Sequence, residues 1–194
     1  MLSKRSHLHT TGWIESIKRD GPYRSDGSGI PWMNYQTVQF LEKRLKSDFT
    51  LFEYGSGFST RFWAGHVKQV ISVEYDKHWF SAVKENIPEI VTLIFREKDV
   101  DGDYCRTIIE MNRLFDIVIV DGRDRVNCVK QSINALTERG VIVLDDSQRK
   151  PYREAVTFAC ENGFRALDFE GLKPTEFRTH RTTILYRDNN CLDI

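Results

Sequence analysis

Apolar and polar positions follow two alternating periods along the chain, one typical of helices and one of buried strands. From residue 34 to residue 46, Val38, Leu41 and Leu45 recur at helical intervals, and residues 47–54 then form an apolar strand run. This change of period repeats down the chain. It predicts helices over residues 59–64, 77–87, 125–140 and 151–163, a short helix near residue 103, and strands over residues 69–75, 90–95, 115–122 and 140–147.

Buried, β-branched strands that alternate with amphipathic helices predict a parallel sheet covered on both faces. The tail departs from this pattern, because residues 163–171 and 181–187 are two strand-like runs with no helix between them. Such runs predict an antiparallel hairpin at one edge of the sheet. The expected fold class is therefore α/β, a doubly wound and mostly parallel seven-stranded sheet with helices on both faces and a C-terminal antiparallel hairpin.

The length of the chain limits the number of domains. A chain of 194 residues holds one sizeable core, so one Rossmann-like domain is predicted over residues 35–194. Residues 1–34 form a polar segment with scattered aromatic side chains, among them Tyr23 and Trp32. Two interpretations of this segment stay open: a lid that closes over a bound ligand, or a segment that docks on the sheet edge or on a second subunit.

A glycine loop follows the first predicted strand, in the stretch LFEYGSGFST at residues 51–60. In open α/β sheets, ligands bind beyond the carboxyl ends of the strands, and glycine lets a ligand approach the backbone. A dinucleotide site calls for GxGxxG, but Thr60 stands at the third glycine position. Glu53 would repel a pyrophosphate and suits a ligand with an ammonium and a sulfonium group. Charge therefore favours S-adenosylmethionine over a dinucleotide.

Two further acidic positions fit a nucleoside ligand. Glu74 ends the second strand about 20 residues after the loop, where a carboxylate can accept hydrogen bonds from both hydroxyls of a ribose. After the third strand come Asp99, Asp101 and Asp103, any of which could face an adenine edge, and Asp99 is included in the predicted cofactor site.

The order of these motifs resembles that of class I S-adenosylmethionine-dependent methyltransferases, over roughly Asn34 to Arg187. The shared features are ExGSG, an acidic end to the next strand, VDG at 120–122, LDD at 144–146 and a terminal hairpin. In that family one antiparallel strand is inserted between its neighbours in the sheet, and the hairpin is similar to it. The resemblance implies that the cofactor is bound by Glu53, Gly55, Ser56, Gly57, Glu74, Asp99 and Asp121.

Three carboxylates should meet at the far strand ends, because Asp121 ends the fourth strand and Asp145 and Asp146 end the fifth. Converging carboxylates repel, and Mg²⁺ or another divalent cation is one remedy. The arrangement partly resembles metal-dependent catechol and caffeoyl-ester O-methyltransferases, which implies metal ligands at these three positions. The sequence departs from them in its Asp-Asp pair and in Asp124, which replaces an expected lysine base. The alternative is that Asp146 caps a helix and Asp121 pairs with Arg123 or Arg125.

The predicted function is methyl transfer from S-adenosylmethionine to a small molecule, at an oxygen atom. Three residues are candidates for removing the acceptor's proton, namely Asp121, Asp146 and His180. Two rival interpretations remain. One is a nicotinamide-dependent oxidoreductase, and the other is a non-catalytic methyltransferase-like module that binds a nucleoside.

Charge and cysteine content limit the partners. Lysine plus arginine equals aspartate plus glutamate, at 28 each, which argues against nucleic acid or an anionic membrane as a partner. The four cysteines lie far apart without a CxxC pair, as is typical of reduced thiols in a cytoplasmic protein. A cytoplasmic location is therefore predicted. The sequence leaves the oligomeric state open, with a homodimer as one alternative.

Overall fold

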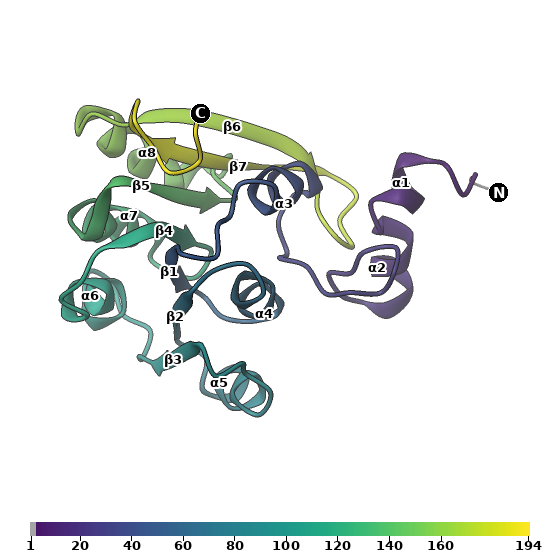
Figure 1. Cartoon of the computed structure of the whole chain (residues 1–194), viewed down its shortest axis with the longest axis horizontal. Helices are drawn as coiled ribbons and strands as arrows, with labels where there is room; N and C mark the ends of the chain where they lie inside the picture. Colours follow the sequence, from purple (N-terminus) through teal and green to yellow (C-terminus); the bar gives the residue numbers. More distant parts are fainter. Residues whose placement is uncertain (1–2) are drawn as a thin grey trace.

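A single sheet of seven strands organises the computed structural model, which describes residues 3–194. Its strands lie in the order β3-β2-β1-β4-β5-β7-β6 (Figure 1). They are β1 (Thr50–Tyr54), β2 (Gln69–Glu74), β3 (Val91–Phe95), β4 (Phe115–Val120), β5 (Leu136–Asp145), β6 (Arg165–Leu172) and β7 (Thr179–Tyr186). Strands β1 to β5 pair in parallel, whereas β7 pairs antiparallel with both β5 and β6. The predicted fold class, including the inserted antiparallel strand, is confirmed.

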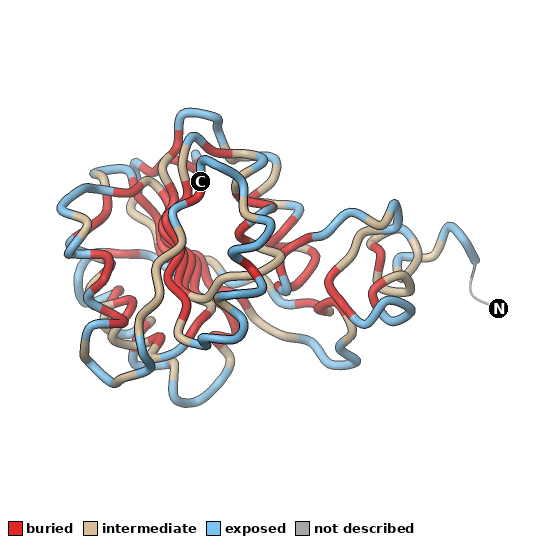
Figure 2. Tube along the Cα trace, turned by 90° about the horizontal axis from the view of Figure 1, so that it is seen from below, coloured by how far each residue is buried: buried red, intermediate tan, exposed pale blue. Residues whose placement is uncertain are grey.

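Helices cover both faces of this sheet (Figure 1). On one side lie α3 (Tyr35–Glu42), α4 (Phe58–Ala64) and α5 (Lys77–Lys84), and on the other lie α6 (Asp103–Glu110), α7 (Arg125–Ser132) and α8 (Arg153–Glu161). Two short 3₁₀ helices, η1 (Ile133–Ala135) and η2 (Lys150–Tyr152), flank α7 and α8. The central strands are buried on both faces and form the red core of Figure 2.

Strand periodicity divides the core into two layers. In β1, Phe52 and Tyr54 pack into the cluster beneath α6, α7 and α8, whereas Leu51 packs into the cluster beneath α3 and α4. In β4, Val118 and Ile117 alternate in the same way. Because both faces are apolar, these strands are continuous hydrophobic runs in the sequence, as is typical of parallel sheets.

The predicted helix over residues 125–140 is wrong in its second half. Helix α7 ends at Ser132, and β5 already begins at Leu136. A bulge accounts for the early start, since Phe115 pairs with Leu136 but Ile117 pairs with Val141. Strand pairing with β4 therefore overrides the local helical pattern of this segment.

The N-terminal segment extends to one side of the sheet and contains two short helices, α1 (His7–Thr10) and α2 (Trp13–Arg19), which the sequence pattern did not predict (Figures 1 and 2). Two indole groups attach it to the β6–β7 loop. Trp13 Nε1 donates to Glu176 O (2.8 Å), and Trp32 Nε1 donates to Pro174 O (2.9 Å). The segment is thus docked on the C-terminal hairpin, while its predicted role as a lid stays a prediction.

No helix within residues 3–194 combines the length and apolar character needed to cross a membrane.

Candidate active site

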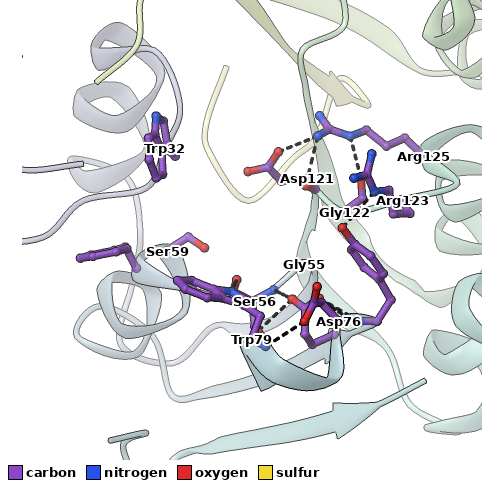
Figure 3. Close-up of a pocket in the computed structure, with 14 residues that line it drawn as sticks. Trp32, Gly55, Ser56, Ser59, Asp76, Trp79, Asp121, Gly122, Arg123 and Arg125 are labelled. Carbon is purple, nitrogen blue, oxygen red and sulfur yellow. Dashed lines mark hydrogen bonds and ion pairs between the residues drawn. The ribbon is translucent and has the colours of Figure 1, made fainter. Parts of the chain in front are cut away.

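A pocket of about 480 Å³ opens at the carboxyl ends of β1, β2 and β4 (Figure 3). Its floor is the glycine loop from Gly55 to Ser59, and one side is formed by Glu74, Asp76 and Trp79. The other sides consist of the stretch after β4 and, from the N-terminal segment, Trp32. The pocket therefore lies where an open α/β sheet binds its ligand.

Two loops touch at the floor of this pocket. Gly55 has a left-handed backbone, with φ +92°, and a Cβ atom at this position would lie 2.9 Å from the Cα of Gly122. Only glycine satisfies both the conformation and the contact. The loop after β1 and the loop after β4 can therefore approach each other, and together they form a continuous backbone surface.

Gly55→Ala is expected to lower the free energy of unfolding by about 2–4 kcal/mol, because it adds both backbone strain and an overlap. Urea unfolding measures this change. Gly65→Ala is the matched control, since Gly65 has a helical φ of −75° and room for a methyl group. If the two variants are equally stable, the contact between the loops does not constrain Gly55.

Glu53 lies beneath the glycine loop, fully buried and outside the pocket lining. Its carboxylate accepts hydrogen bonds from four side chains, at distances of 2.5–3.0 Å, from Ser59, Thr60, Trp63 and Ser72. Burial raises the pKa of Glu53, although these four hydrogen bonds oppose the shift. Glu53 thus ties β1, β2 and α4 together, and its predicted direct contact with a ligand is not favoured by this arrangement.

Glu74 does reach the pocket, at the end of β2. One carboxylate oxygen accepts from Ser56 N (2.9 Å) and Ser56 Oγ (3.0 Å), and the other accepts from Tyr75 N and Asp76 N. Glu74 therefore holds the glycine loop in position. Each oxygen of Glu74 already accepts two hydrogen bonds. Its predicted contact with a ribose therefore requires that the Ser56 hydroxyl release the carboxylate.

Asp99 is not among the residues that line the pocket. Its carboxylate accepts from Tyr104 N (3.3 Å), in the first turn of α6. The neighbouring Asp101 pairs with Arg106 (2.8 Å). The adenine contact of Asp99 stays a prediction.

The three aspartates at the far strand ends do come together, as the sequence predicted, but with three cations around them. One of these, Arg149, pairs with Asp146 (2.6 Å). Arg125 makes its shortest ion pair with Asp121 (2.9 Å) and lies 3.7 and 3.9 Å from Asp145 and Asp146. The ammonium of Lys173 contacts Asp145 and Asp146, the latter at 2.7 Å. Asp121 therefore pairs with Arg125, as one of the alternatives held, whereas Asp146 caps neither η2 nor α8.

These neighbours set the protonation states of the cluster. Burial and the charge of Asp145 raise the pKa of Asp121 to about 8, and Arg125 opposes the rise. Burial alone would raise the pKa of Asp146, but Lys173 and Arg125 bring it down to about 2. Asp121 is 23% exposed in its side chain and lines the pocket, so it is the member that can exchange a proton with a ligand.

The donor set does not fit a divalent metal ion. The space between Asp145 and Asp146 is taken by the Lys173 ammonium, and the remaining oxygen of Asp145 accepts from Thr182 Oγ1 (2.7 Å). Among residues 3–194, no group of three His, Cys, Asp or Glu side chains has the geometry to hold a metal ion. The metal site predicted at Asp121, Asp145 and Asp146 is therefore corrected to an internal ion-pair cluster.

His180 contacts Asp146, a member of this cluster that does not line the pocket. Its Nδ1 lies 3.0 Å from Asp146 Oδ1, and His180 does not line the pocket either. Of the three candidate proton acceptors, Asp121 alone reaches the cavity.

Sequence reasoning missed Lys173 and Trp79. Trp79 Nε1 donates to Ser56 O (2.7 Å), and its ring covers Gly57. Lys173 directly follows β6, 28 residues from Asp145. The only signal in the sequence was the Asp-Asp pair itself, which needs a cation.

Comparison with known proteins gives similar folds only. No protein-family model matches the sequence, and no curated protein is significantly similar to it. Among solved structures, a precorrin 8W decarboxylase from Methanobacterium thermoautotrophicum is similar, with 16% identity and a TM-score of 0.60 over 87% of this chain and 97% of that one. An rRNA methylase from Streptococcus thermophilus has 14% identity and a TM-score of 0.58, over 79% and 95% of the two chains.

A third similar structure carries a ligand. It is a putative methyltransferase from Streptococcus mutans in complex with SAH, with 14% identity and a TM-score of 0.57 over 78% of this chain and 96% of that one. At these identities the similarity shows a shared fold, the one found in S-adenosylmethionine-dependent methyltransferases.

Proposed function

We propose that this protein transfers a methyl group from S-adenosylmethionine to a small acceptor, at oxygen. The main support is the strand order of the sheet, in which antiparallel β7 lies between β5 and β6. The glycine loop and Glu74, at the ends of β1 and β2, add to it. Dinucleotide-binding sheets of the Rossmann type have the order 3-2-1-4-5-6. The order seen here, together with Thr60 in place of a third glycine, supports the methyltransferase over the nicotinamide-dependent oxidoreductase.

The cofactor end of the pocket would be formed by the first two strands. Gly55 and Gly57 expose backbone to the methionine part, and Glu74 accepts from the ribose once the Ser56 hydroxyl turns away. Glu53 acts from below by fixing Ser59 and Thr60, which sit in the first turn of α4.

The acceptor end would lie between Asp121 and Trp32, which face each other across the pocket in Figure 3. Methyl transfer is an in-line displacement, so the protein must position the acceptor and take up its proton. We assign the uptake of the proton to Asp121, because it is the only carboxylate of the cluster that lines the cavity. Since its pKa is raised to about 8, the deprotonated form takes up the proton, and the transfer rate should rise as the pH increases toward that value. The aromatic faces of Trp32 and Phe58 would hold an acceptor with a planar or apolar part.

Calorimetry with S-adenosylhomocysteine, NAD and NADP tests the cofactor class. Binding of S-adenosylhomocysteine alone is expected, because Thr60 stands at the third glycine position of a dinucleotide loop and the strand order differs from that of dinucleotide-binding sheets. Tight binding of NAD without S-adenosylhomocysteine would refute the proposal.

A transfer assay with labelled S-adenosylmethionine tests the acceptor. Small hydroxylated molecules form one panel, and total RNA forms the second, because one similar structure is an rRNA methylase. Labelling in the first panel supports the proposal. Labelling of RNA alone would replace the small acceptor with a nucleic acid, and cofactor binding without any labelling favours the non-catalytic module.

A further inference from the structure

Three carboxylates meet in one small volume at the ends of β4 and β5. Asp145 is fully buried and Asp146 is 4% exposed, while Asp121 forms the side toward the pocket. Arg125 contacts all three within 4 Å. Arg149, which is half exposed, also pairs with Asp146 (2.6 Å). Two guanidinium groups do not neutralise three carboxylates, so the cluster requires a further cation in its interior.

Lys173 supplies that cation from a distant part of the chain. It is 6% exposed, and its Nζ contacts Asp145 and Asp146 together. Burial alone would lower the pKa of Lys173, but Asp145, Asp121 and Asp146 raise it above its usual value, so the side chain is an ammonium. Thr182 donates to the second oxygen of Asp145, and Arg149 pairs with the second oxygen of Asp146, so both oxygens of each buried carboxylate have a partner.

We propose that the ammonium of Lys173 is the resident cation of this site and occupies the place of a divalent metal ion, so that the carboxylates are held together without a metal. The proposal concerns ion binding and does not rest on the proposed methyl transfer. Unlike a metal ion, this cation is part of the chain, because Lys173 lies at the start of the loop between β6 and β7. The same loop accepts hydrogen bonds from Trp13 and Trp32, so the cation also anchors the docking point of the N-terminal segment.

The test is to remove the amine and ask whether a metal ion replaces it. Melting temperatures are measured in EDTA and in Mg²⁺ or Mn²⁺ at matched ionic strength, and Mn²⁺ binding is followed by electron paramagnetic resonance. Lys173→Ala is expected to bind Mn²⁺ and to gain about 3–6 °C in Tm when the ion is at tenfold its Kd. The unaltered protein should show neither effect.

Two further variants serve as controls. Lys130→Ala removes a lysine from an exposed pair with Glu154 and should create no ion response. Asp145→Asn combined with Lys173→Ala removes one charge of each sign and should abolish the Mn²⁺ response while keeping the fold.

Two results would overturn the proposal: saturable Mn²⁺ binding by the unaltered protein that Asp145→Asn abolishes, or a folded Lys173→Ala that ignores divalent ions. If Lys173→Ala does not fold in EDTA, it is refolded with Mn²⁺. Recovery of the fold then supports the proposal, and failure contradicts it.

Discussion

Asp121→Asn is expected to lower the rate of methyl transfer by about 10²–10⁴-fold, the usual contribution of a positioned proton acceptor. The amide keeps the size of the side chain but cannot take up a proton. Binding of S-adenosylhomocysteine should remain close to that of the unaltered protein, because the proposed cofactor end of the pocket lies on β1 and β2. A loss of this binding would instead support the cofactor contact that the resemblance implied for Asp121. The measurement is single-turnover transfer to an acceptor found in the screen, beside calorimetry of the nucleoside.

Asp124→Asn is the matched control for this experiment. It removes an equal charge three residues along, and Asp124 is bound to Asp101 N (2.8 Å) and Asn127 outside the pocket. Its transfer rate should be nearly unchanged. An Asp121→Asn variant that transfers methyl at the original rate would remove Asp121 from the mechanism.

Glu53→Ala is expected to destabilise the protein by about 3–5 kcal/mol. The substitution leaves four donors without their acceptor, three of them on the buried residues Thr60, Trp63 and Ser72, and it opens a cavity beneath the glycine loop. Urea unfolding at one fixed pH gives the free energy of unfolding. The same variant should bind S-adenosylhomocysteine more weakly, because Ser59 and Thr60 lose their anchor.

Ser59→Ala is the control for Glu53, since it removes one of the four donors and leaves the carboxylate in place. It should cost about 1 kcal/mol. The pH must be held constant because the pKa of Glu53 is raised in the folded state. Its contribution to stability is complete below the ordinary pKa of 4.5 and is lost as pH rises through the folded value. Equal losses from the two variants would mean that Glu53 is not the centre of this network.

Local periodicity was enough to predict the sheet and the place of the pocket. Strand runs such as residues 115–120 are apolar on both faces, and the glycines after β1 mark the position where backbone must be exposed. The predicted helix over residues 125–140 failed because its second half depends on pairing with β4, a contact that local sequence does not contain. The two N-terminal helices are too short for a periodic signal.

The site was harder to predict because its key contacts are distant in sequence. The charge argument treated Glu53 as a free carboxylate, whereas Ser72 and Trp63 converge on it only in the folded chain. The metal prediction assumed that Asp145 and Asp146 had no cation nearby, but Lys173 reaches them from the hairpin. Glu74, in contrast, sits at a strand end that the strand order alone brings to the pocket.

The hydrogen bond from Trp32 to Pro174 joins residues 142 positions apart, and this has a consequence for the newly made chain. Ribosomes add about 5–20 residues per second, so Trp32 is synthesised about 7–28 seconds before Pro174. During that interval the glycine loop and the first strands can already pair, while the wall of the pocket formed by Trp32 has nothing to attach to. The pocket is therefore completed last, when the C-terminal hairpin joins the sheet.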